Sequence, residues 1–281
     1  MNHKPESQIE AALSHLPNLD PGLPAGSPER GKTQSLTERM EHYRVSGVSV
    51  AVVEDYELAW ARGWGEIRRG SGIPVTPETM FESGSVSKFP VAFAVLRLVE
   101  RGVVDLDRDV NDYLASWKLP KTKLTATEPV TLRRLLTHTS GIPSADQTSW
   151  ALGSTPTLAQ VLAGKRPATN KPVEIRTLPG SEHHYSNAGY ILVQQLLEEA
   201  VGRPLDQIMR SEVFGHCGMT SSTYAPTNPM WTRSFHAQPH LKDGSPAQSE
   251  LHPSAFAQGG LLTTPTDLAR FAREVMLAAA R

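Results

Sequence analysis

Three side chains of this sequence have the chemistry for acyl transfer without a histidine. Ser85 and Lys88 form a Ser-x-x-Lys pattern at the head of a long apolar run, and Tyr185-Ser186-Asn187 follows much later in the chain. Residues three apart on a helix lie on one face, so the amine at position 88 reaches the hydroxyl at position 85. The two motifs together offer a nucleophile, an amine and a phenol.

The chemistry depends on the protonation state of Lys88. An exposed lysine is protonated at neutral pH, but burial and the positive end of a helix dipole both lower the pKa of its amine. A neutral or proton-sharing Lys88 can deprotonate Ser85, whose backbone N–H at the helix N-terminus is placed to bind a developing oxyanion. The pattern also arises by chance in a chain of this size, so a structural surface lysine is the alternative to a buried catalytic one.

Tyr185 and Asn187 are the candidates for the remaining roles. A nearby cation stabilises phenolate, so Tyr185 is suited to take the Ser85 proton and pass it to the leaving group. The Asn187 amide can donate to a substrate carbonyl and accept from Lys88. Tyr-x-Asn is a weak pattern alone, and the alternative interpretation of Asn187 is a helix cap ahead of Gly189.

The elements around these motifs are predicted from periodicity and caps. The apolar run from Phe89 to Arg101 predicts a helix buried on most faces and ended by Gly102, with Ser85 at or near its N-terminus. Ser35 and Glu38 form a capping box. The other predicted elements are a β-hairpin at 48–53 and 58–64, helices at 131–136, 157–162, 190–201 and 204–213, a short strand within 259–264, and a last helix over 268–280 capped by Thr266-Asp267.

These elements predict an α+β protein in three parts. Residues 1–34 form an N-terminal arm, residues 35–102 and 254–281 form an α/β subdomain, and residues 103–253 form a mostly helical insert. The sheet of the α/β subdomain is expected to be antiparallel and flanked by helices.

Several segments resemble the family of serine β-lactamases, DD-peptidases and their esterase relatives, above all its class C branch. The resemblance runs from about Val48 to Phe271. The segments that carry it are Thr79-Met80-Phe81-Glu82-Ser83-Gly84-Ser85-Val86-Ser87-Lys88, Leu135-Leu136-Thr137-His138-Thr139-Ser140-Gly141-Ile142, Pro179-Gly180, Tyr185-Ser186-Asn187-Ala188-Gly189-Tyr190, Gly218-Met219-Thr220, Gly259-Gly260-Leu261 and Asp267-Leu268-Ala269.

The resemblance implies a fold and a set of roles. The fold is the β-lactamase/DD-peptidase-like antiparallel sheet with helices and a helical insert. Ser85 is then the acylated nucleophile, Lys88 its activating amine, Tyr185 the general base or proton shuttle, and Asn187 a substrate-binding partner. The reaction is two-step acyl transfer through an acyl-enzyme.

The sequence departs from the family at its C-terminal end. Relatives carry a Lys-Thr-Gly or His-x-Gly triplet on a strand well downstream of the segment that matches Gly259-Gly260-Leu261, and no such triplet follows here. His216-Cys217-Gly218 has the letters but lies in the helical insert, so we reject it. We therefore expect that the C-terminal strands are missing from this chain, that it is truncated or one part of a split protein, and that helix 89–101 loses part of its cover.

The missing C-terminal strands predict that the sheet of this chain is incomplete. A lone hairpin is marginal in water, so we expect the chain alone to be weakly stable or weakly active unless a partner or a further C-terminal segment completes the sheet.

Composition narrows the function classes. The net charge is -1 and no Lys/Arg block stands out, so nucleic acid is not expected as a partner. The apolar runs are too short for a membrane span, the N-terminus has no apolar signal region, and Cys217 is the only cysteine; a cytoplasmic location is expected. Neither a His-Glu-x-x-His nor a paired Cys-x-x-Cys pattern occurs, so no metal or cofactor is expected.

The first functional hypothesis is therefore a β-lactamase-like carboxylesterase that cleaves small esters or amides. The alternatives are a β-lactamase or DD-peptidase acting on β-lactams or D-Ala-D-Ala, and an impaired binding or scaffold protein that lacks the third motif.

Overall fold

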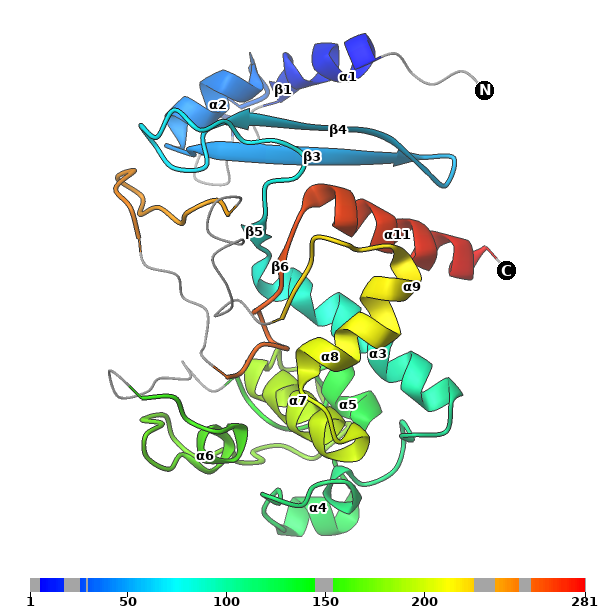
Figure 1. Cartoon of the computed structure of the whole chain (residues 1–281). Coiled ribbons are helices and arrows are strands. Elements are labelled where there is room, and N and C mark those ends of the chain that lie inside the picture. Colours follow the sequence, from blue (N-terminus) through cyan, green and yellow to red (C-terminus); the bar gives the residue numbers. More distant parts are fainter. Residues whose placement is uncertain are drawn as a thin grey trace. The chain divides into compact units, whose positions relative to one another are not determined.

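The computed structural model describes residues 6–17, 26–28, 30–144, 154–224, 236–247 and 254–280 (Figure 1). These residues form two compact units. The first takes those within Met1–Phe81, Ser234–Ser249 and Thr264–Arg281, and the second those within Glu82–Arg233 and Glu250–Thr263.

The first unit is built on an antiparallel hairpin of β3 (Gly47–Glu54) and β4 (Glu57–Gly65), which confirms the predicted strands. Asp55 and Tyr56 make the two-residue turn with φ of 50° and 62°, the signs that a type I′ hairpin turn requires. Helix α11 (Pro265–Ala279) packs on both strands. Figure 1 shows α11 on one side of the hairpin and the N-terminal helices on the other.

Capping explains where the helices of this unit begin. Ser35 and Glu38 form the predicted capping box of α2 (Leu36–His42), with Ser35 Oγ accepting from the Glu38 N–H at 3.2 Å. The predicted cap of the last helix is wrong: Thr264 caps α11 and accepts from the Asp267 N–H at 3.1 Å. Pro265 takes the first helical position, where a missing N–H costs nothing. The unit also contains α1 (Glu6–Leu13), β1 (Leu16–Pro17) and β2 (Thr33–Gln34).

The second unit is mostly helical around α7 (Asn187–Val201), which is buried on every side from Ala188 to Leu197. It confirms the predicted helices and the short strand after Gly260, although α7 begins three residues earlier than predicted. Its other elements are η1 (Gly84–Ser87), α3 (Lys88–Glu100), η2 (Val110–Asp112), α4 (Lys123–Thr127), α5 (Leu132–Leu136), α6 (Leu158–Ala163), α8 (Leu205–Met209), the π-helical η3 (Arg210–Phe214), α9 (Gly215–Cys217) and β6 (Leu262–Thr263). Strand β5 (Phe81–Glu82) contains the division between the units.

Helix α3 confirms the predicted burial on most faces. Val91 and Val95 are fully buried, and the exposed apolar side chains are Phe89, which is 70 % exposed, and Leu96, which is 51 % exposed. These two residues lie two turns apart, so they form one exposed stripe on an otherwise covered helix. The apolar pattern does not say which element would cover that stripe.

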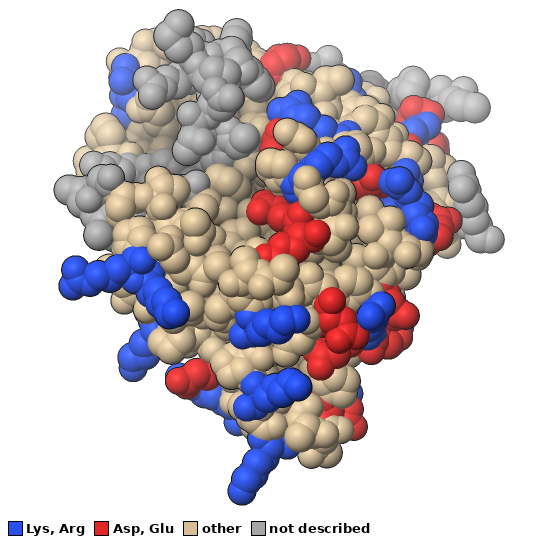
Figure 2. Space-filling model, turned by 60° about the horizontal axis from the view of Figure 1, so that its bottom comes forward, with Lys and Arg blue, Asp and Glu red and all other residues tan. Residues whose placement is uncertain are grey.

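Charges of both signs are interspersed with uncharged residues on the face that Figure 2 presents. Within the described ranges, no helix is both long and apolar enough to cross a membrane.

Candidate active site

Ser85 and Lys88 lie on either side of the start of α3. Gly84, with φ of 52°, leads into the 3₁₀ turn η1 that carries Ser85, and Lys88 is the first residue of the helix. Ser85 is exposed, whereas Lys88 is only 5 % exposed. The structure therefore places Lys88 in the buried position rather than the surface position.

The three predicted side chains meet in the second unit. Lys88 Nζ donates to Ser85 Oγ at 3.0 Å, and Ser85 Oγ lies 2.6 Å from the Tyr185 hydroxyl. Nζ also lies 4.9 Å from the centre of the Tyr185 ring and 5.6 Å from that of Tyr190. Ser85 Oγ thus has both a proton donor and a proton acceptor within hydrogen-bond reach.

A backbone carbonyl completes the surroundings of the amine. Lys88 Nζ donates to the Gln258 carbonyl as well as to Ser85 Oγ. The sequence analysis missed Gln258, because every residue carries a carbonyl and only the path of the chain brings this one to the amine.

Asn187 lies at the same end of α7 but differs from expectation. It is half-buried, and its side-chain amide has no hydrogen bond to any residue that the structure describes, so the expected bond with Lys88 is not formed. The cap interpretation of Asn187 is also wrong. Ser186 is the N-cap, and its Oγ accepts from the Gly189 N–H at 3.0 Å.

The surroundings move the pKa values of the amine and the phenol in the same direction. Burial lowers the pKa of Lys88, against the opposing effect of Tyr185. Burial raises the pKa of Tyr185, but its hydrogen bonds with Lys88 and Ser85 and the charge of Lys88 outweigh burial, and the net pKa is below the ordinary value. Tyr190 differs, since burial raises its pKa to about 12 and it stays neutral. The pKa values of Lys88 and Tyr185 thus lie closer to neutral pH than those of a free amine and a free phenol.

The His138 ring packs against the Tyr185 ring. Its ring centre lies 4.6 Å from that of Tyr185, and its Nδ1 accepts from the Ser186 N–H at 3.1 Å. Its carbonyl accepts from the His184 N–H at 2.8 Å. Burial, and then the charge of Lys88, lower the pKa of His138, so the imidazole is neutral and its Nδ1 stays an acceptor. His138 thus bonds to backbone groups through both its ring and its carbonyl.

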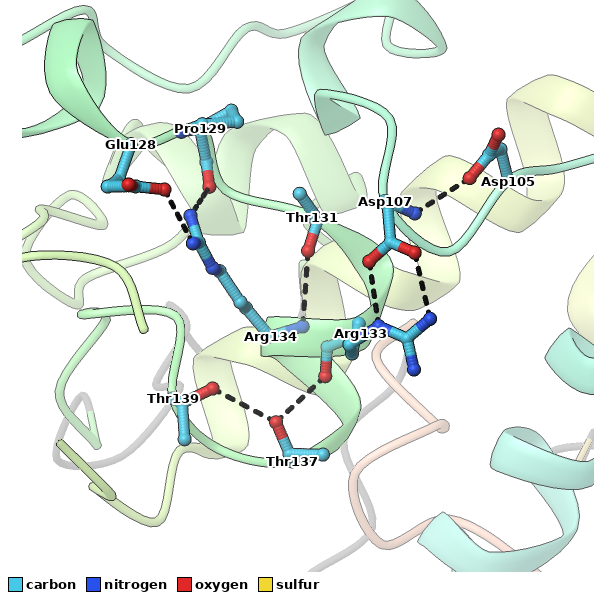
Figure 3. Close-up of polar contacts among 9 residues, drawn as sticks. All are labelled: Asp105, Asp107, Glu128, Pro129, Thr131, Arg133, Arg134, Thr137 and Thr139. Carbon is cyan, nitrogen blue, oxygen red and sulfur yellow. Dashed lines mark hydrogen bonds and ion pairs between the residues drawn. The ribbon is translucent and has the colours of Figure 1, made fainter. Parts of the chain in front are cut away.

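Two arginines fix the helix that precedes His138 (Figure 3). Arg133 on α5 forms a bidentate pair with Asp107 at 2.7 and 2.8 Å. Arg134 donates to Glu128 and to the Pro129 carbonyl, both at 2.6 Å. The Asp107 pair is exposed and adds little stability, but it orients α5 against the preceding loop.

Hydrogen bonds also tie the nucleophile turn to the segment after Gln258. Ser87 Oγ donates to the Gly84 carbonyl at 2.6 Å and accepts from the Leu261 N–H at 2.9 Å. Ser83 donates its N–H and its hydroxyl to the Leu261 carbonyl, each at 3.0 Å. The turn that carries Ser85 is thus fixed at both ends, which holds the Ser85 hydroxyl in one place.

Known proteins are similar to this chain in sequence and in fold. The sequence profile of the Beta-lactamase family matches residues 33–281. Penicillin-binding protein 4 of Amycolatopsis lactamdurans is 31% identical over 241 residues, which are 84% of this chain and 60% of that protein. The D-alanyl-D-alanine-carboxypeptidase/endopeptidase AmpH of Escherichia coli (strain K12) is 25% identical over 82% of this chain and 57% of its own length.

A solved structure agrees. The octameric penicillin-binding protein homologue from Pyrococcus abyssi superposes with a TM-score of 0.69 and 27% identity, over 86% of this chain and 55% of that one. The chain therefore spans little more than half the length of these relatives. Because the family profile covers nearly the whole sequence, the chain belongs to the beta-lactamase family.

Proposed function

We propose that this chain is a serine hydrolase that cleaves small esters or amides through an acyl-enzyme on Ser85. One observation carries the proposal: Ser85 Oγ lies within hydrogen-bond distance of both the buried Lys88 amine and the Tyr185 hydroxyl. A serine hydroxyl is a weak nucleophile unless an adjacent base takes its proton.

Lys88 and Tyr185 act as one coupled base, and each of them contributes to its apparent pKa. In the state that lacks one proton, the pair accepts the Ser85 proton while Oγ attacks the substrate carbonyl. The backbone N–H of Ser85 binds the oxyanion, and Asn187 binds the substrate. Tyr185 returns the proton to the leaving group as the C–O or C–N bond breaks. Water then repeats the sequence and frees Ser85.

The second candidate is action on β-lactams or on D-Ala-D-Ala peptides. The names of two relatives, a penicillin-binding protein and a D-alanyl-D-alanine-carboxypeptidase, favour it. Both candidates form an acyl-enzyme on Ser85, and they differ in the acyl group that the site accepts.

A substrate panel separates the candidates. We expect the chain to turn over p-nitrophenyl acetate, and to show slower turnover of nitrocefin and of a D-Ala-D-Ala peptide. Turnover of the peptide or nitrocefin ahead of the ester would favour the second candidate. A chain that neither turns over any substrate nor reacts with a fluorophosphonate probe would be the binding or scaffold protein of the third hypothesis.

We also propose that a partner or a further C-terminal segment completes the sheet of β3 and β4. The pairing of these two strands with no third strand among the described residues supports this proposal. The same panel, run with the 281-residue chain and with a longer form of it, should show higher turnover for the longer form. Cooperative unfolding and equal turnover of the shorter chain would contradict it.

For location, we propose the cytoplasm, because Cys217 is the only cysteine and no intrachain disulfide can form. Cell fractionation with an antibody against the chain tests this, and secretion into the medium would contradict it.

A further inference from the structure

Gln194 is a buried amide on α7 whose hydrogen bonds are all made. It is 1 % exposed. Its Oε1 accepts from the N–H groups of Phe256 at 2.8 Å and Ala257 at 3.1 Å. Its Nε2 donates to the Ser254 carbonyl and to Glu198, each at 2.9 Å. An amide has two donor hydrogens and an acceptor oxygen with two lone pairs, so this one is fully used.

These bonds fix the path of the segment that leads to the site. Ser254, Phe256 and Ala257 directly precede Gln258, whose carbonyl accepts from Lys88 Nζ. The N–H groups of Gly259 and Gly260 both donate to the Phe256 carbonyl, at 3.1 and 2.6 Å. A Cβ on Gly260 would lie 2.8 Å from the Phe256 backbone, so this turn accepts no larger residue there. The direction of the Gln258 carbonyl is therefore set one residue away from the atoms that Gln194 binds.

Glu198, one turn further along α7, holds Gln194 in place. Its Oε1 accepts from Gln194 Nε2 and from the Leu205 N–H, both at 2.9 Å. The amide is thus oriented on one side by Glu198, which the Leu205 N–H of α8 holds in turn, and on the other by the segment that it binds. A residue that only filled space would not need this orientation.

We propose that Gln194 is a positioning residue for acyl transfer, which aims the Gln258 carbonyl at Lys88 Nζ and so keeps the amine directed at Ser85 Oγ. This inference rests on the function proposed above. Gln194 does not contact Ser85, Lys88 or Tyr185, so it acts through the segment alone. Without Gln194 the carbonyl is no longer held in this direction, and the amine loses the Gln258 carbonyl as an acceptor.

Loss of the Gln258 carbonyl as an acceptor is expected to change the pKa of Lys88 in one direction. A carbonyl that accepts from an ammonium stabilises the charged form, so its removal lowers the pKa of Lys88 further. The acid limb of the rate profile therefore moves to lower pH. The amine is also less well placed, and a misplacement of this kind lowers kcat by about 10- to 100-fold.

The test compares Gln194→Met with Gln195→Met. Gln195 is the next residue on the same helix and is 7 % exposed, but its amide donates to Ser116 and Glu199, away from the segment. We expect Gln194→Met to lower kcat on p-nitrophenyl acetate by about 10-fold or more with KM within about 2-fold. Its acid limb should lie at lower pH than that of the wild type, and Gln195→Met should leave the limb in place. Gln194→Glu keeps the acceptor for Phe256 and Ala257 and serves if Gln194→Met does not fold; there a partial effect is expected.

A second readout does not depend on turnover. The titration of Lys88, followed by NMR of its side-chain ¹³Cε, should shift to lower pH in Gln194→Met and not in Gln195→Met. If the wild type is inactive but the titration shifts as described, the proposed function fails and the positioning role stands. If the Lys88 titration and the acid limb of Gln194→Met each lie at the same pH as those of the wild type, the positioning role is overturned.

Discussion

Replacing Ser85 by alanine is expected to lower kcat for ester hydrolysis by about 10⁴- to 10⁶-fold, as loss of the nucleophile does in other serine hydrolases. Ser85 Oγ is the atom that lies 3.0 Å from Lys88 Nζ and 2.6 Å from the Tyr185 hydroxyl, and no other hydroxyl of the described chain is placed between them. The measurement is steady-state turnover of p-nitrophenyl acetate with both variants at the same concentration. Ser14→Ala, which removes an exposed hydroxyl from the end of α1, is the control and should leave kcat unchanged.

Retention of more than about a tenth of the wild-type kcat in Ser85→Ala would contradict this assignment, since a passive serine would be the explanation. A comparable loss of kcat in Ser14→Ala would instead indicate an assay artefact.

Replacing Lys88 by methionine is expected to lower kcat by about 10²- to 10⁴-fold, which is the range for loss of a general base. Methionine fills the same buried space but carries no proton and no charge. Tyr185 then loses the cation that lowers its pKa and stays protonated at neutral pH. Lys88→Arg keeps the charge but is never deprotonated, so it separates the two roles of the amine.

The direction in which the rate of hydrolysis changes with pH follows from the pKa values of the amine and the phenol. The pKa values of both Lys88 and Tyr185 lie below their ordinary values, so the pair loses its first proton at a lower pH than free groups would. Activity is therefore expected above this apparent pKa and should fall as pH drops through it. Turnover by Lys88→Met should lack that limb. A limb unchanged in Lys88→Met and Lys88→Arg would show that another group controls the rate.

The sequence predicted well those features that depend on neighbours in the chain. The capping box of Ser35 and Glu38 and the hairpin before the nucleophile follow from local spacing, and both were confirmed. The meeting of Ser85 and Lys88 follows from their spacing at a helix start. The contact with Tyr185, much later in the chain, came from the family resemblance, because local spacing carries no information about it.

The sequence could not predict contacts between segments that are far apart in the chain. The Gln258 carbonyl and the Leu261 backbone groups bind the nucleophile turn, but a backbone group has no residue-type signal. The exposed stripe of Phe89 and Leu96 on the otherwise buried α3 was missed for a similar reason, since an apolar residue shows a preference for burial but not the presence of a covering element. The start of α11 was mispredicted because two threonines, Thr264 and Thr266, compete as caps, and Pro265 decides between them.

The most direct test is to trap the acyl group and find where it is attached. The chain is incubated with a slowly deacylating ester or a fluorophosphonate, the intact mass is measured, and the modified peptide is sequenced by mass spectrometry. A single adduct on Ser85, formed much more slowly in Lys88→Met and absent from Ser85→Ala, is the predicted result. An adduct on another residue, or one that forms on Ser85 at the same rate without the Lys88 amine, would contradict the account.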